Sequence, residues 1–548
     1  MNRTFLLRLE GVNLFNFVFD TRDLSTIRGS GLMLLDAVDT AESILKKEVG
    51  KANISVLSRG ASSGLFEIET SDPAPTAQNV RDDLEKAFPY ATFVVDVVEK
   101  SPEDVSSPNR FRSDIEALMA ANRWRQMQAS SLAIPPKNIA PRMMVKPACA
   151  LDGLRPAVND VEHGAPNRST DKDAFICDAV LRRRNYGLDK KQTFYKNVVE
   201  RVAGRDASPE QKRALYTFAQ TLPAFAADFE KIANQSDNRL TSQNNKRLNG
   251  KLAVFYADGN NFGKKQTEHC KDPKSQMAFD EFLRSRREIF LTEFIEMAVQ
   301  SNEWTMTDAG KKVIRFETLL WGGDEVMFVM PAPLGWHFAA FFFRKMGGLN
   351  LNQAKIAGGT TLADVPLTHA AALVFCQHHA PIDRIKHLAK DQMAEFAKKT
   401  DRTRDSLVAV ALESFDHLGS GYETAMKKRY NGAIPLEQII LRGTPEKSLA
   451  DCLSDIATHI TALRQSESFA RSQLRGLVSD MLAEPATADE RAKFLEDDKN
   501  GKWSPPRAFR NTGEPERKLL HESLLPLFGG SPAALWIQLE ELWDYALS

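Results

Sequence analysis

The chain has 548 residues, too many for one hydrophobic core, which predicts roughly two to four domains. Its 72 basic and 72 acidic residues give a formal net charge of +0, which excludes a dominant charge-driven affinity for nucleic acid or a membrane surface. Five scattered cysteines, no signal-peptide core and no apolar run of transmembrane length predict a soluble cytoplasmic protein without a disulfide framework.

Residues 1–100 alternate strand and helix signals. An apolar start is followed by a helical stretch, a hairpin-like pair (ISVLS, then GLFEIET), a helix (PTAQNVRDDLEKAF) and a final strand (ATFVVDVVE). This order is βαββαβ, the order of the ferredoxin-like fold. We therefore predict a first ferredoxin-like domain over residues 1–100.

Residues 101–245 read as helices broken by polar and proline-rich loops. The loop at 132–174 has the composition of a linker. The basic run LRRRNYGLDKKQTFYK at 181–196 mixes arginine, lysine and tyrosine, which could hold phosphates and stack on bases. A solvated helix is the favoured interpretation, because the chain as a whole is neutral.

Residues 246–430 repeat the alternation of strand and helix, in the order strand, long amphipathic helix, hairpin, helix, strand, helix and strand. This pattern predicts a second ferredoxin-like domain. Residues 431–548 predict a helical C-terminal domain that ends with exposed aromatic side chains and offers a surface to protein partners. The fold class is thus α+β, with two ferredoxin-like (βαββαβ) domains joined by a helical insert.

The hairpin of the second domain has an unusual tip. Two apolar runs meet at Gly322-Gly323-Asp324-Glu325. A plain turn explains glycine and aspartate, since glycine tolerates positive φ and aspartate accepts backbone hydrogen bonds. Two adjacent carboxylates between buried strands repel each other, however, unless a cation lies between them, and a divalent ion with its preference for oxygen suits that position.

A partner carboxylate lies at the end of the first strand of this domain. Asp258 closes the apolar run KLAVFYA and precedes Gly259, which lets the backbone approach a ligand closely. The first and third strands of a ferredoxin-like sheet are neighbours, so Asp258 is expected beside Asp324 and Glu325. Nucleotidyl transfer needs divalent ions held in this way by separated carboxylates.

The motifs YADGNNFGK at 256–264 and LLWGGDEVMF at 319–328 resemble the metal motifs of palm domains in the GGDEF and class III nucleotidyl cyclase group. They are similar in particular to the polymerase-like large subunit of type III CRISPR effector complexes. The stretch FVFDTRDLSTIRGSGLMLLDAV also resembles the first palm of that subunit. The resemblance covers nearly the whole chain and implies a first palm (1–100), a helical insert (101–245), a second palm (246–430) and a helical C-terminal domain (431–548).

Carried over residue by residue, the resemblance implies that Asp258, Asp324 and Glu325 are catalytic and bind Mg²⁺ or Mn²⁺, with the Gly259 carbonyl as a further ligand. It implies nucleotide contacts, above all with ATP, for a larger group of residues. These are Gly259, Asn260, Asn261, Gly263, Lys264, Gly322, Gly323 and Lys398. For Lys264 a solvated charge is an equal alternative.

The chain departs from the family in several places. Glu325 stands where the CRISPR subunit usually has aspartate, and Asn260 stands where a further aspartate is often found. No His-Asp dipeptide occurs, so the nuclease domain that often precedes the first palm is expected to be absent. The zinc ribbon of the family has a counterpart around Cys149, His163 and Cys177, which lacks a CxxC pair and reads as degenerate.

These observations predict a metal-dependent nucleotidyltransferase or cyclase that makes a cyclic or short oligonucleotide signal from NTP, with ATP favoured, in antiviral defence. An RNA trigger and protein partners are compatible with the resemblance, and a membrane is not expected. The alternative is a catalytically inactive nucleotide-binding sensor or scaffold subunit, which Asn260 and Glu325 keep open. A third and weaker interpretation is a dinucleotide cyclase that acts on GTP.

Overall fold

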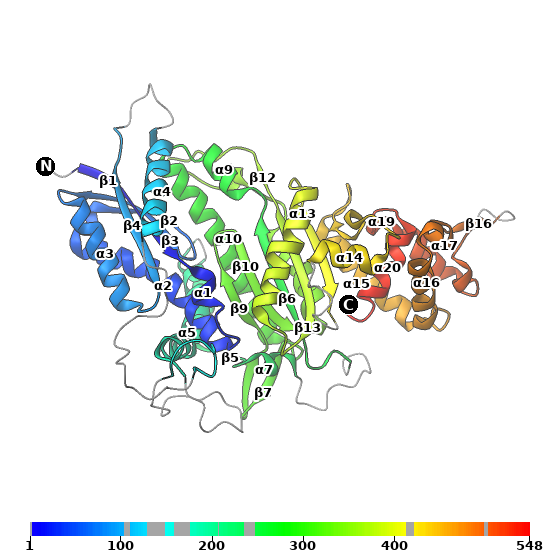
Figure 1. Cartoon of the computed structure of the whole chain (residues 1–548). Helices are drawn as coiled ribbons and strands as arrows, with labels where there is room; N and C mark the ends of the chain where they lie inside the picture. Colours follow the sequence, from blue (N-terminus) through cyan, green and yellow to red (C-terminus); the bar gives the residue numbers. More distant parts are fainter. Residues whose placement is uncertain are drawn as a thin grey trace.

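The structure is a computed structural model. It describes residues 3–102, 110–128, 148–157, 176–205, 208–234, 247–412, 421–497 and 502–547. Most of the loop predicted at 132–174 therefore lies outside the described residues. Helices and several sheets alternate along the chain, and the predicted α+β class is confirmed. Figure 1 shows the chain running from an N-terminal sheet, through a larger central sheet, to a helical region at the opposite end.

The N-terminal sheet has four antiparallel strands in the order β2-β3-β1-β4. They are β1 (Arg3–Val12), β2 (Ile54–Arg59), β3 (Ser63–Thr70) and β4 (Thr92–Glu99). Successive side chains of β1 point to opposite faces, so Leu7 enters the main core while Leu6 packs against Ile115 and Leu118. Helices cover both faces as a result.

Three helices and one short turn of helix belong to this sheet. They are α1 (Leu14–Val18), α2 (Leu24–Glu48), α3 (Pro73–Ala87) and α4 (Arg110–Gln128). The Asp23 side chain accepts a hydrogen bond from the backbone N–H of Thr26 and so caps α2. The strand order and the two crossover helices are those of a ferredoxin-like βαββαβ unit.

The helical insert packs on the N-terminal sheet through its longest helix. The described elements of the insert are α5 (Asp178–Gly204), α6 (Pro209–Gln220), β5 (Ala224–Phe225) and α7 (Phe229–Ala233). Helix α5 crosses α2 where Gly29 meets Gly187. A Cβ on Gly29 would lie 1.7 Å from the Arg183 carbonyl oxygen, and a Cβ on Gly187 would lie 2.0 Å from that of Ser25. Only glycine allows the two backbones to approach this closely.

The basic run 181–196 lies in α5, and the solvated helix favoured for it is wrong for part of the run. Arg183 and Lys191 are buried. The Arg183 guanidinium binds the carboxylate of Asp20 at 2.8 Å, and the Lys191 ammonium lies 3.4 Å from Glu317. These cations join the insert to both sheets, because a buried charge must find a partner.

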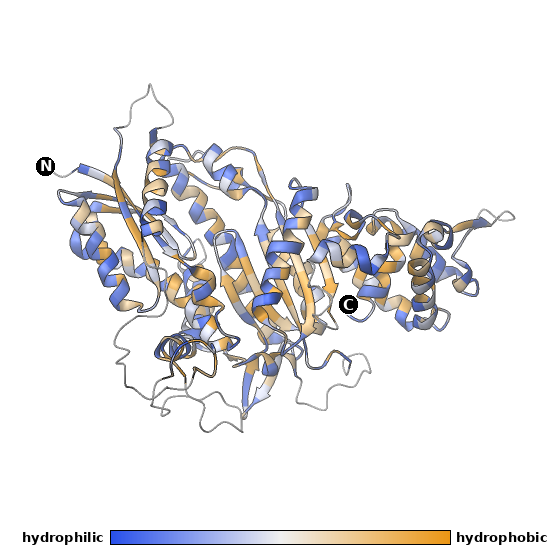
Figure 2. Cartoon of the chain, in the orientation of Figure 1, coloured by the Kyte–Doolittle hydropathy of each residue, from blue (hydrophilic) through white to orange (hydrophobic). Residues whose placement is uncertain are grey.

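The central sheet has six strands in the order β15-β14-β13-β6-β10-β9. They are β6 (Lys251–Gly259), β9 (Glu317–Trp321), β10 (Glu325–Pro331), β13 (His369–Gln377), β14 (Ser406–Ala411) and β15 (Leu441–Arg442). The four strands β13-β6-β10-β9 again have the ferredoxin-like order, and β14 adds a parallel strand beside β13. Strands β6 and β10 are neighbours, as predicted. Figure 2 shows how apolar residues gather along these strands.

Helices and short strands complete the central region. They are α9 (Phe262–His269), α10 (Pro273–Gln300), α11 (Gly335–Met346), α12 (Ile382–His387), the π-helical segment η4 (Leu388–Ala394), α13 (Glu395–Thr400), β7 (Thr305–Asp308), β8 (Lys311–Ile314), β11 (Leu349–Asn350) and β12 (Pro366–Leu367). Aromatic rings of α10 and α11, such as Phe290 and Phe338, pack on Phe255 and Phe328 from one face of the sheet. Segments α12, η4 and α13 form one continuous helix, whose η4 and α13 parts lie over the other face (Figure 1).

The C-terminal region is mainly helical. Its elements are α14 (Tyr422–Tyr430), α15 (Leu449–Gln465), α16 (Arg471–Ala483), α17 (Ala488–Ala492), β16 (Leu495–Asp497), β17 (Lys502–Ser504), α18 (Glu514–Lys518), η9 (Leu519–Leu524), α19 (Leu525–Leu527) and α20 (Pro532–Leu542). The exposed aromatic surface predicted for its end is wrong, since Trp536, Trp543 and Tyr545 are buried and the Tyr545 ring stacks on Phe375 of β13. Within the described residues, no helix is long and apolar enough to cross a membrane.

Candidate functional site

Three predicted carboxylates meet at one edge of the central sheet. Asp258 near the end of β6 lies directly opposite Glu325 at the start of β10. Cross-strand partners in an antiparallel pair point to the same face, so both carboxylates leave the sheet together. Asp324 precedes Glu325, and its carbonyl oxygen accepts a hydrogen bond of 3.1 Å from the backbone N–H of Gly259. The turn that carries Asp324 is thereby tied to the end of β6.

The glycines at the site serve close backbone packing. A Cβ on Gly322 would lie 2.9 Å from the carbonyl oxygen of Glu325, to which the Gly322 N–H donates at 2.7 Å. A Cβ on Gly323 would meet no atom within 4 Å, which leaves room beside the carboxylates. Gly259 packs under the Phe262 ring, because a Cβ there would lie 2.5 Å from it. The packing of Phe262 accounts for Gly259 without a ligand.

Two lysines of one helix hold the carboxylates. The Lys398 ammonium of α13 binds the Asp258 carboxylate, and the Lys390 ammonium of η4 binds the Glu325 carboxylate. The Tyr256 hydroxyl also donates to Glu325, at 2.8 Å. Lys398 was predicted from its motif as a phosphate contact, whereas here its partner is a carboxylate. Sequence analysis missed Lys390 and Tyr256, although Tyr256 lies two residues before Asp258 and so on the same face of β6.

The π-helical segment explains how both lysines reach the site. Lys390 and Lys398 are eight residues apart, and in a regular α-helix they would point about 80° away from each other. Segment η4 has the wider turn of a π-helix, which takes more residues per turn. The extra residue per turn brings both ammonium groups to the side that faces β6 and β10.

Burial and mutual repulsion shift the pKa values of the carboxyl groups at this site. Burial, and next the charge of Asp258, raise the pKa of Asp324 from its ordinary value of 3.8 to about 6. Burial also raises the pKa of Asp258, although Lys398 opposes that shift. Burial works to lower the pKa of Lys390, but Glu325 outweighs it and the pKa lies above its ordinary value. Three carboxylates therefore share two lysines, and the set has one negative charge in excess when all are ionised.

This donor set fits a divalent cation that prefers oxygen. Mg²⁺ and Mn²⁺ bind carboxylate and carbonyl oxygens, and Asp258, Asp324 and Glu325 supply carboxylates at one sheet edge. Burial, and next the negative charge of Asp258, raise the pKa of Asp324, and a bound cation would oppose both effects. The chemistry of this donor set thus fits the metal that the motifs imply, although in the described residues the three carboxylates do not bring their oxygen atoms within 4.8 Å of one another.

The loop after Asp258 holds the remaining predicted residues. The Asn260 side chain is buried and donates to Thr368 at 3.0 Å and to the Arg404 carbonyl at 3.3 Å, so it links strand ends inside the protein. Asn261 has a left-handed backbone (φ 59°), and its side chain accepts from Arg402 at 3.0 Å. Gly263 has open space around it. Lys264 is exposed and lies 3.7 Å from Glu268.

A cavity of about 330 Å³ opens beside Glu325 and Lys390. Its walls come from the N-terminal and the central regions: Leu14 and Phe15 of helix α1 on one side, and Leu319 and Trp321 of strand β9 on the other. Most of the lining is apolar, with charged groups at the Glu325 end. Such a cavity suits a small molecule with one flat apolar part and one charged part.

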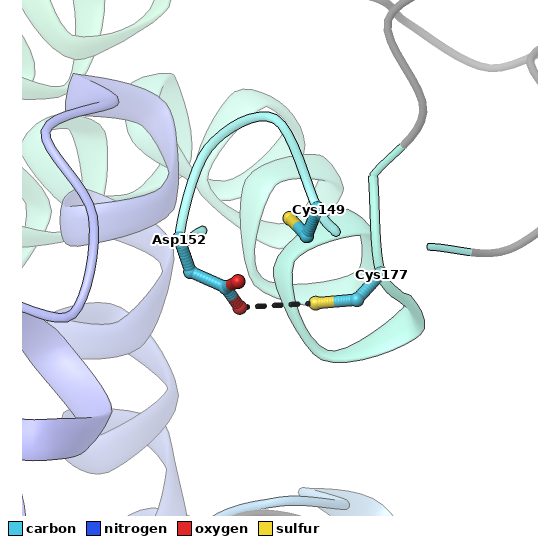
Figure 3. A group of neighbouring side chains, drawn as sticks. All are labelled: Cys149, Asp152 and Cys177. Carbon is cyan, nitrogen blue, oxygen red and sulfur yellow. Dashed lines mark hydrogen bonds between the residues drawn. The ribbon is translucent and has the colours of Figure 1, made fainter. Parts of the chain in front are cut away.

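The region compared with a zinc ribbon brings two cysteines together with an unpredicted aspartate. Ligand atoms of Cys149, Asp152 and Cys177 all lie within 4.8 Å of one another (Figure 3). The Cys177 thiol donates to Asp152 at 3.3 Å. The neighbouring Cys177 side chain, and next backbone N–H groups, lower the pKa of Cys149 to about 6 against the effect of burial. His163 lies outside the described residues.

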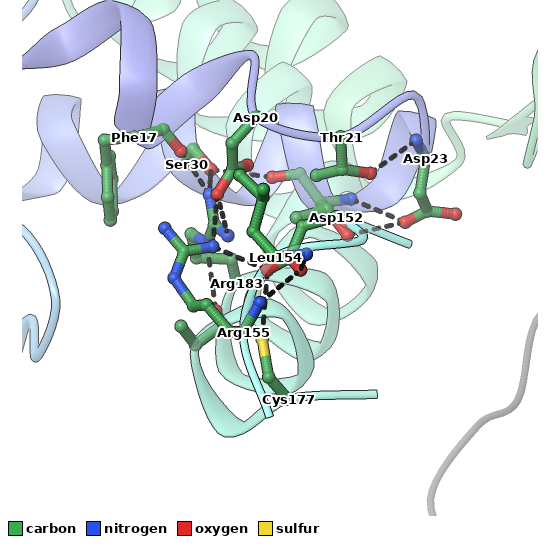
Figure 4. Close-up of polar contacts among 12 residues, drawn as sticks. Phe17, Asp20, Thr21, Asp23, Ser30, Asp152, Leu154, Arg155, Cys177 and Arg183 are labelled. Atoms are coloured by element: carbon green, nitrogen blue, oxygen red, sulfur yellow. Dashed lines mark hydrogen bonds and ion pairs between the residues drawn. The ribbon is translucent and has the colours of Figure 1, made fainter. Parts of the chain in front are cut away.

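These three residues do not fit a structural zinc ion. The Asp152 carboxylate already accepts from the backbone N–H groups of Leu154 (2.8 Å) and Arg155 (3.0 Å), and the Arg155 guanidinium binds it at 2.7 Å. A structural zinc site takes four nitrogen or sulfur ligands, whereas the described residues supply two sulfurs and a carboxylate that an arginine neutralises. Arg155 and Arg183 also share Asp20, which fixes this loop and α5 to the start of the chain (Figure 4).

Neither a protein-family model nor a curated protein matches the sequence. Solved structures resemble the fold. A Csm1-Csm4 cassette in complex with cA4 is 12% identical with a TM-score of 0.47, and the match covers 97% of this chain and 70% of that chain. Csm1 in T. onnurineus is 11% identical with a TM-score of 0.45 and the same coverage. A Csm1-Csm4 subcomplex in the type III-A CRISPR-Csm interference complex is 13% identical with a TM-score of 0.44. These three matches concern the fold, each over 97% of this chain at 11–13% identity.

Proposed function

We propose that the chain is a metal-dependent nucleotidyltransferase that condenses nucleoside triphosphates, ATP above all, into a cyclic or short linear oligonucleotide signal in antiviral defence. The observation that carries this proposal is the meeting of Asp258, Asp324 and Glu325 at neighbouring strand ends under a helix that brings two lysines. The product class and the defence role come from the resemblance of the motifs. In this proposal the N-terminal sheet is a first palm (1–100) and the central sheet is a second palm (246–430).

The residues have distinct roles in the proposed reaction. Asp258, Asp324 and Glu325 bind the divalent cation, which when bound neutralises the triphosphate and activates the attacking 3′-hydroxyl. Lys390 and Lys398 are the cations nearest the carboxylates, and they are placed to contact phosphate oxygens. The open space at Gly323 leaves room for the nucleotide. Tyr256 orients Glu325 through its hydroxyl.

The cavity beside Glu325 is the proposed place of a base. Its walls are mostly apolar, and its charged end lies next to the carboxylates and lysines. If the base lay between Phe15 and Trp321, the triphosphate of the same nucleotide would point toward Lys390. Because α1 and β9 both line the cavity, the first palm takes part in binding although it lacks the paired carboxylates of the second.

The second candidate is a nucleotide-binding sensor or scaffold without turnover. One observation favours it: each of Asp258 and Glu325 already has a lysine partner, so the site is largely neutralised without a metal. A protein of this kind would bind ATP and change its contacts with partners, and it would leave the nucleotide intact.

The test combines binding and turnover in one set of proteins. The parent, Asp258→Asn, Asp324→Asn and the control Asp308→Asn, whose carboxylate pairs with Lys231 away from the site, are incubated with each α-labelled nucleoside triphosphate in Mg²⁺ or Mn²⁺, with and without RNA. Calorimetry with a non-hydrolysable ATP analogue runs in parallel. We expect phosphatase-resistant oligonucleotide from the parent and the control, and a loss on the order of 10²-fold or more in the two site variants.

The two candidates give different results. Metal-dependent binding that needs Asp258, without product under any condition, would favour the sensor. Product from GTP alone would favour the dinucleotide cyclase. If the parent and Asp258→Asn bound the ATP analogue equally and neither made product, the turn at Gly322–Glu325 would have only a structural role.

A further inference from the structure

A second cavity, of about 250 Å³, lies between α2, α5 and α10. It shares Leu32, Leu35, Phe194 and Trp321 with the cavity beside Glu325, so these side chains form a wall between the two. Unlike the first cavity, it is rich in charged side chains. Arg287 of α10 is among them, and its guanidinium lies over the Trp321 ring at 5.1 Å.

Arg287 is buried without a hydrogen-bond partner for most of its guanidinium. The side chain is 6% exposed, and its Nε and Nη1 atoms have no partner among the described residues. Burial lowers the pKa of Arg287 to about 10, so the group is still charged at neutral pH. An unpaired buried cation is costly, and it persists in a protein where something other than stability retains it.

The acidic side chains of the cavity are already engaged elsewhere. Glu288 binds Arg201 at 2.6 Å and Arg205 at 2.6 Å. Asp39 binds Arg59 at 2.8 Å, and Asp36 accepts from the Tyr186 hydroxyl.

Two cations of the lining, Lys190 and Arg287, form no ion pair in the described residues. Lys190 is exposed and has no carboxylate within ion-pair distance in the described ranges; its ammonium lies 5.8 Å from the Tyr186 ring centroid. With Arg287 it gives the cavity two positive charges that form no ion pair in the part of the chain that the structure describes, although Glu288, Asp280 and Asp324 act on Arg287 through space and Lys190 acts on Asp36.

We propose that this cavity is an anion site that binds a phosphate or pyrophosphate group through Arg287 and Lys190. Its volume admits such a group more readily than a whole nucleoside, since small-molecule sites run from about 300 Å³ upward. Arginine offers a flat pair of donors to phosphate oxygens, and Lys190 adds a mobile charge at the entrance. The anion is either free pyrophosphate or the phosphate tail of a nucleotide. The proposal stands on this geometry alone and on no part of the proposed reaction.

The experiment measures pyrophosphate binding to the full chain in EDTA, by calorimetry and by the shift in melting temperature at matched ionic strength. We compare the parent with Arg287→Met, Lys190→Met and the control Arg286→Met, whose guanidinium lies on the Phe282 ring of the same helix. We expect pyrophosphate to raise the melting temperature of the parent and the control, and binding to weaken at least tenfold in both site variants. Lys190→Met keeps the test valid if Arg287→Met fails to fold, because Lys190 is exposed.

Further arms separate this site from the metal site. Asp324→Asn should bind pyrophosphate at least as well as the parent, since the charge of Asp324 opposes an anion near Arg287. ATP and AMP in the same metal-free buffer distinguish the sources: Arg287-dependent binding of ATP but not AMP identifies a nucleotide tail, and binding of pyrophosphate above ATP identifies the free anion. Absence of binding by the parent, or binding by Arg287→Met and Lys190→Met as tight as that of the parent, would overturn the proposal.

Discussion

His369 and Asp405 lie side by side at the sheet edge that carries the candidate site. The backbone N–H of His369 donates to the Asp405 carboxylate at 2.7 Å, and the ring Nδ1 of His369 lies 3.9 Å from the same carboxylate. Burial lowers the pKa of His369 from 6.5 to about 3, and burial raises the pKa of Asp405 from 3.8 to about 7. One group thus resists taking up a proton and the other resists losing it.

These two shifts oppose each other in their effect on stability. Between pH 4 and 6.5 the unfolded chain protonates His369 but the folded chain does not, so this residue makes stability rise with pH. In the same window the folded chain keeps a proton on Asp405 that the unfolded chain releases, so this residue makes stability fall as pH rises. In the parent the two contributions largely cancel.

We therefore expect the two single variants to have pH slopes of opposite sign. Asp405→Asn should become more stable as pH rises from 4.5 to 6.5, and His369→Gln should become less stable, each by up to about 1.4 kcal/mol per pH unit relative to the parent. Urea unfolding without divalent metal at several pH values measures both slopes. Parallel slopes for the parent and both variants would contradict the burial of these charges.

Single residues of the site could be predicted where a pattern fixes their position. Asp258, Asp324 and Glu325 follow from two apolar runs and the neighbouring strands of a ferredoxin-like order, and the structure brings them together. Asn260 could not be placed in this way, because its burial depends on Thr368 and Arg404, which are distant in sequence. Asp152 and Arg287 were missed because a carboxylate among cysteines and an arginine on a helix are common without any function.

At the scale of elements, the crossing of α2 and α5 depends on two glycines. Gly29→Ala would place a methyl group 1.7 Å from the Arg183 carbonyl oxygen, so the helices must separate. We expect Gly29→Ala and Gly187→Ala each to lower the free energy of unfolding by about 1–3 kcal/mol or more. Chemical denaturation followed by circular dichroism measures the change.

Gly476→Ala in α16 is the matched control. A Cβ there has no neighbour within 4 Å, and alanine favours a helix over glycine by roughly 0.5–1 kcal/mol. This substitution should therefore stabilise the protein slightly. If Gly29→Ala behaved like Gly476→Ala, the close contact between the two helices would be disproved.

The elements also show where sequence analysis fails. Residues 382–399 read as one helix, which the structure contains, but hydrophobic periodicity does not reveal a π-helical segment inside it. That segment decides that Lys390 joins Lys398 at the site. The parallel strand β14 was visible in the sequence as an apolar run. Its pairing with β13 was not, because it depends on how the connecting helix of α12, η4 and α13 packs on the sheet.

At the scale of the molecule, a buried charge cluster joins the N-terminal sheet domain, the insert and the central sheet. Glu317 of β9 is 1% exposed; it accepts from the Arg28 Nε of α2 at 2.9 Å and lies 3.4 Å from the Lys191 ammonium of α5. Burial works to raise the pKa of Glu317, but Arg28 and Lys191 outweigh it and the pKa lies below its ordinary value. Three regions of the chain therefore meet at one carboxylate.

Glu317→Gln keeps the shape of the side chain but leaves Arg28 and Lys191 without a counter-charge. We expect it to destabilise the protein by about 3–5 kcal/mol, and Lys191→Met in the same chain to restore part of the loss. The control is Glu281→Gln, a half-exposed ion pair whose loss should cost no more than about 0.5 kcal/mol. Denaturant midpoints of the four proteins test this, and equal midpoints for Glu317→Gln and Glu281→Gln would contradict it.

The order of helices and strands along the chain could be predicted from the sequence, whereas the contacts between distant segments could not. Apolar periodicity indicated two βαββαβ patterns, a helical insert and a helical end, and the sheet orders have that form. The role of the basic run in α5 was not predictable, because partners such as Asp20 and Glu317 become neighbours only when distant segments pack together. The last helix was misjudged for the same reason, since its aromatic side chains pack inward, Tyr545 against the central sheet.

The two lysine–carboxylate pairs under the η4–α13 helix have a consequence for the order of binding. If the proposed function holds, a divalent ion at Asp258 and Glu325 would have to displace Lys398 and Lys390, so free metal alone would compete with two internal cations. A triphosphate that brings its own metal would give the displaced ammonium groups new partners. Metal and triphosphate would therefore raise each other's affinity by the same factor, as thermodynamic reciprocity requires. The empty protein would hold neither ligand firmly alone, and the pair would bind as a unit.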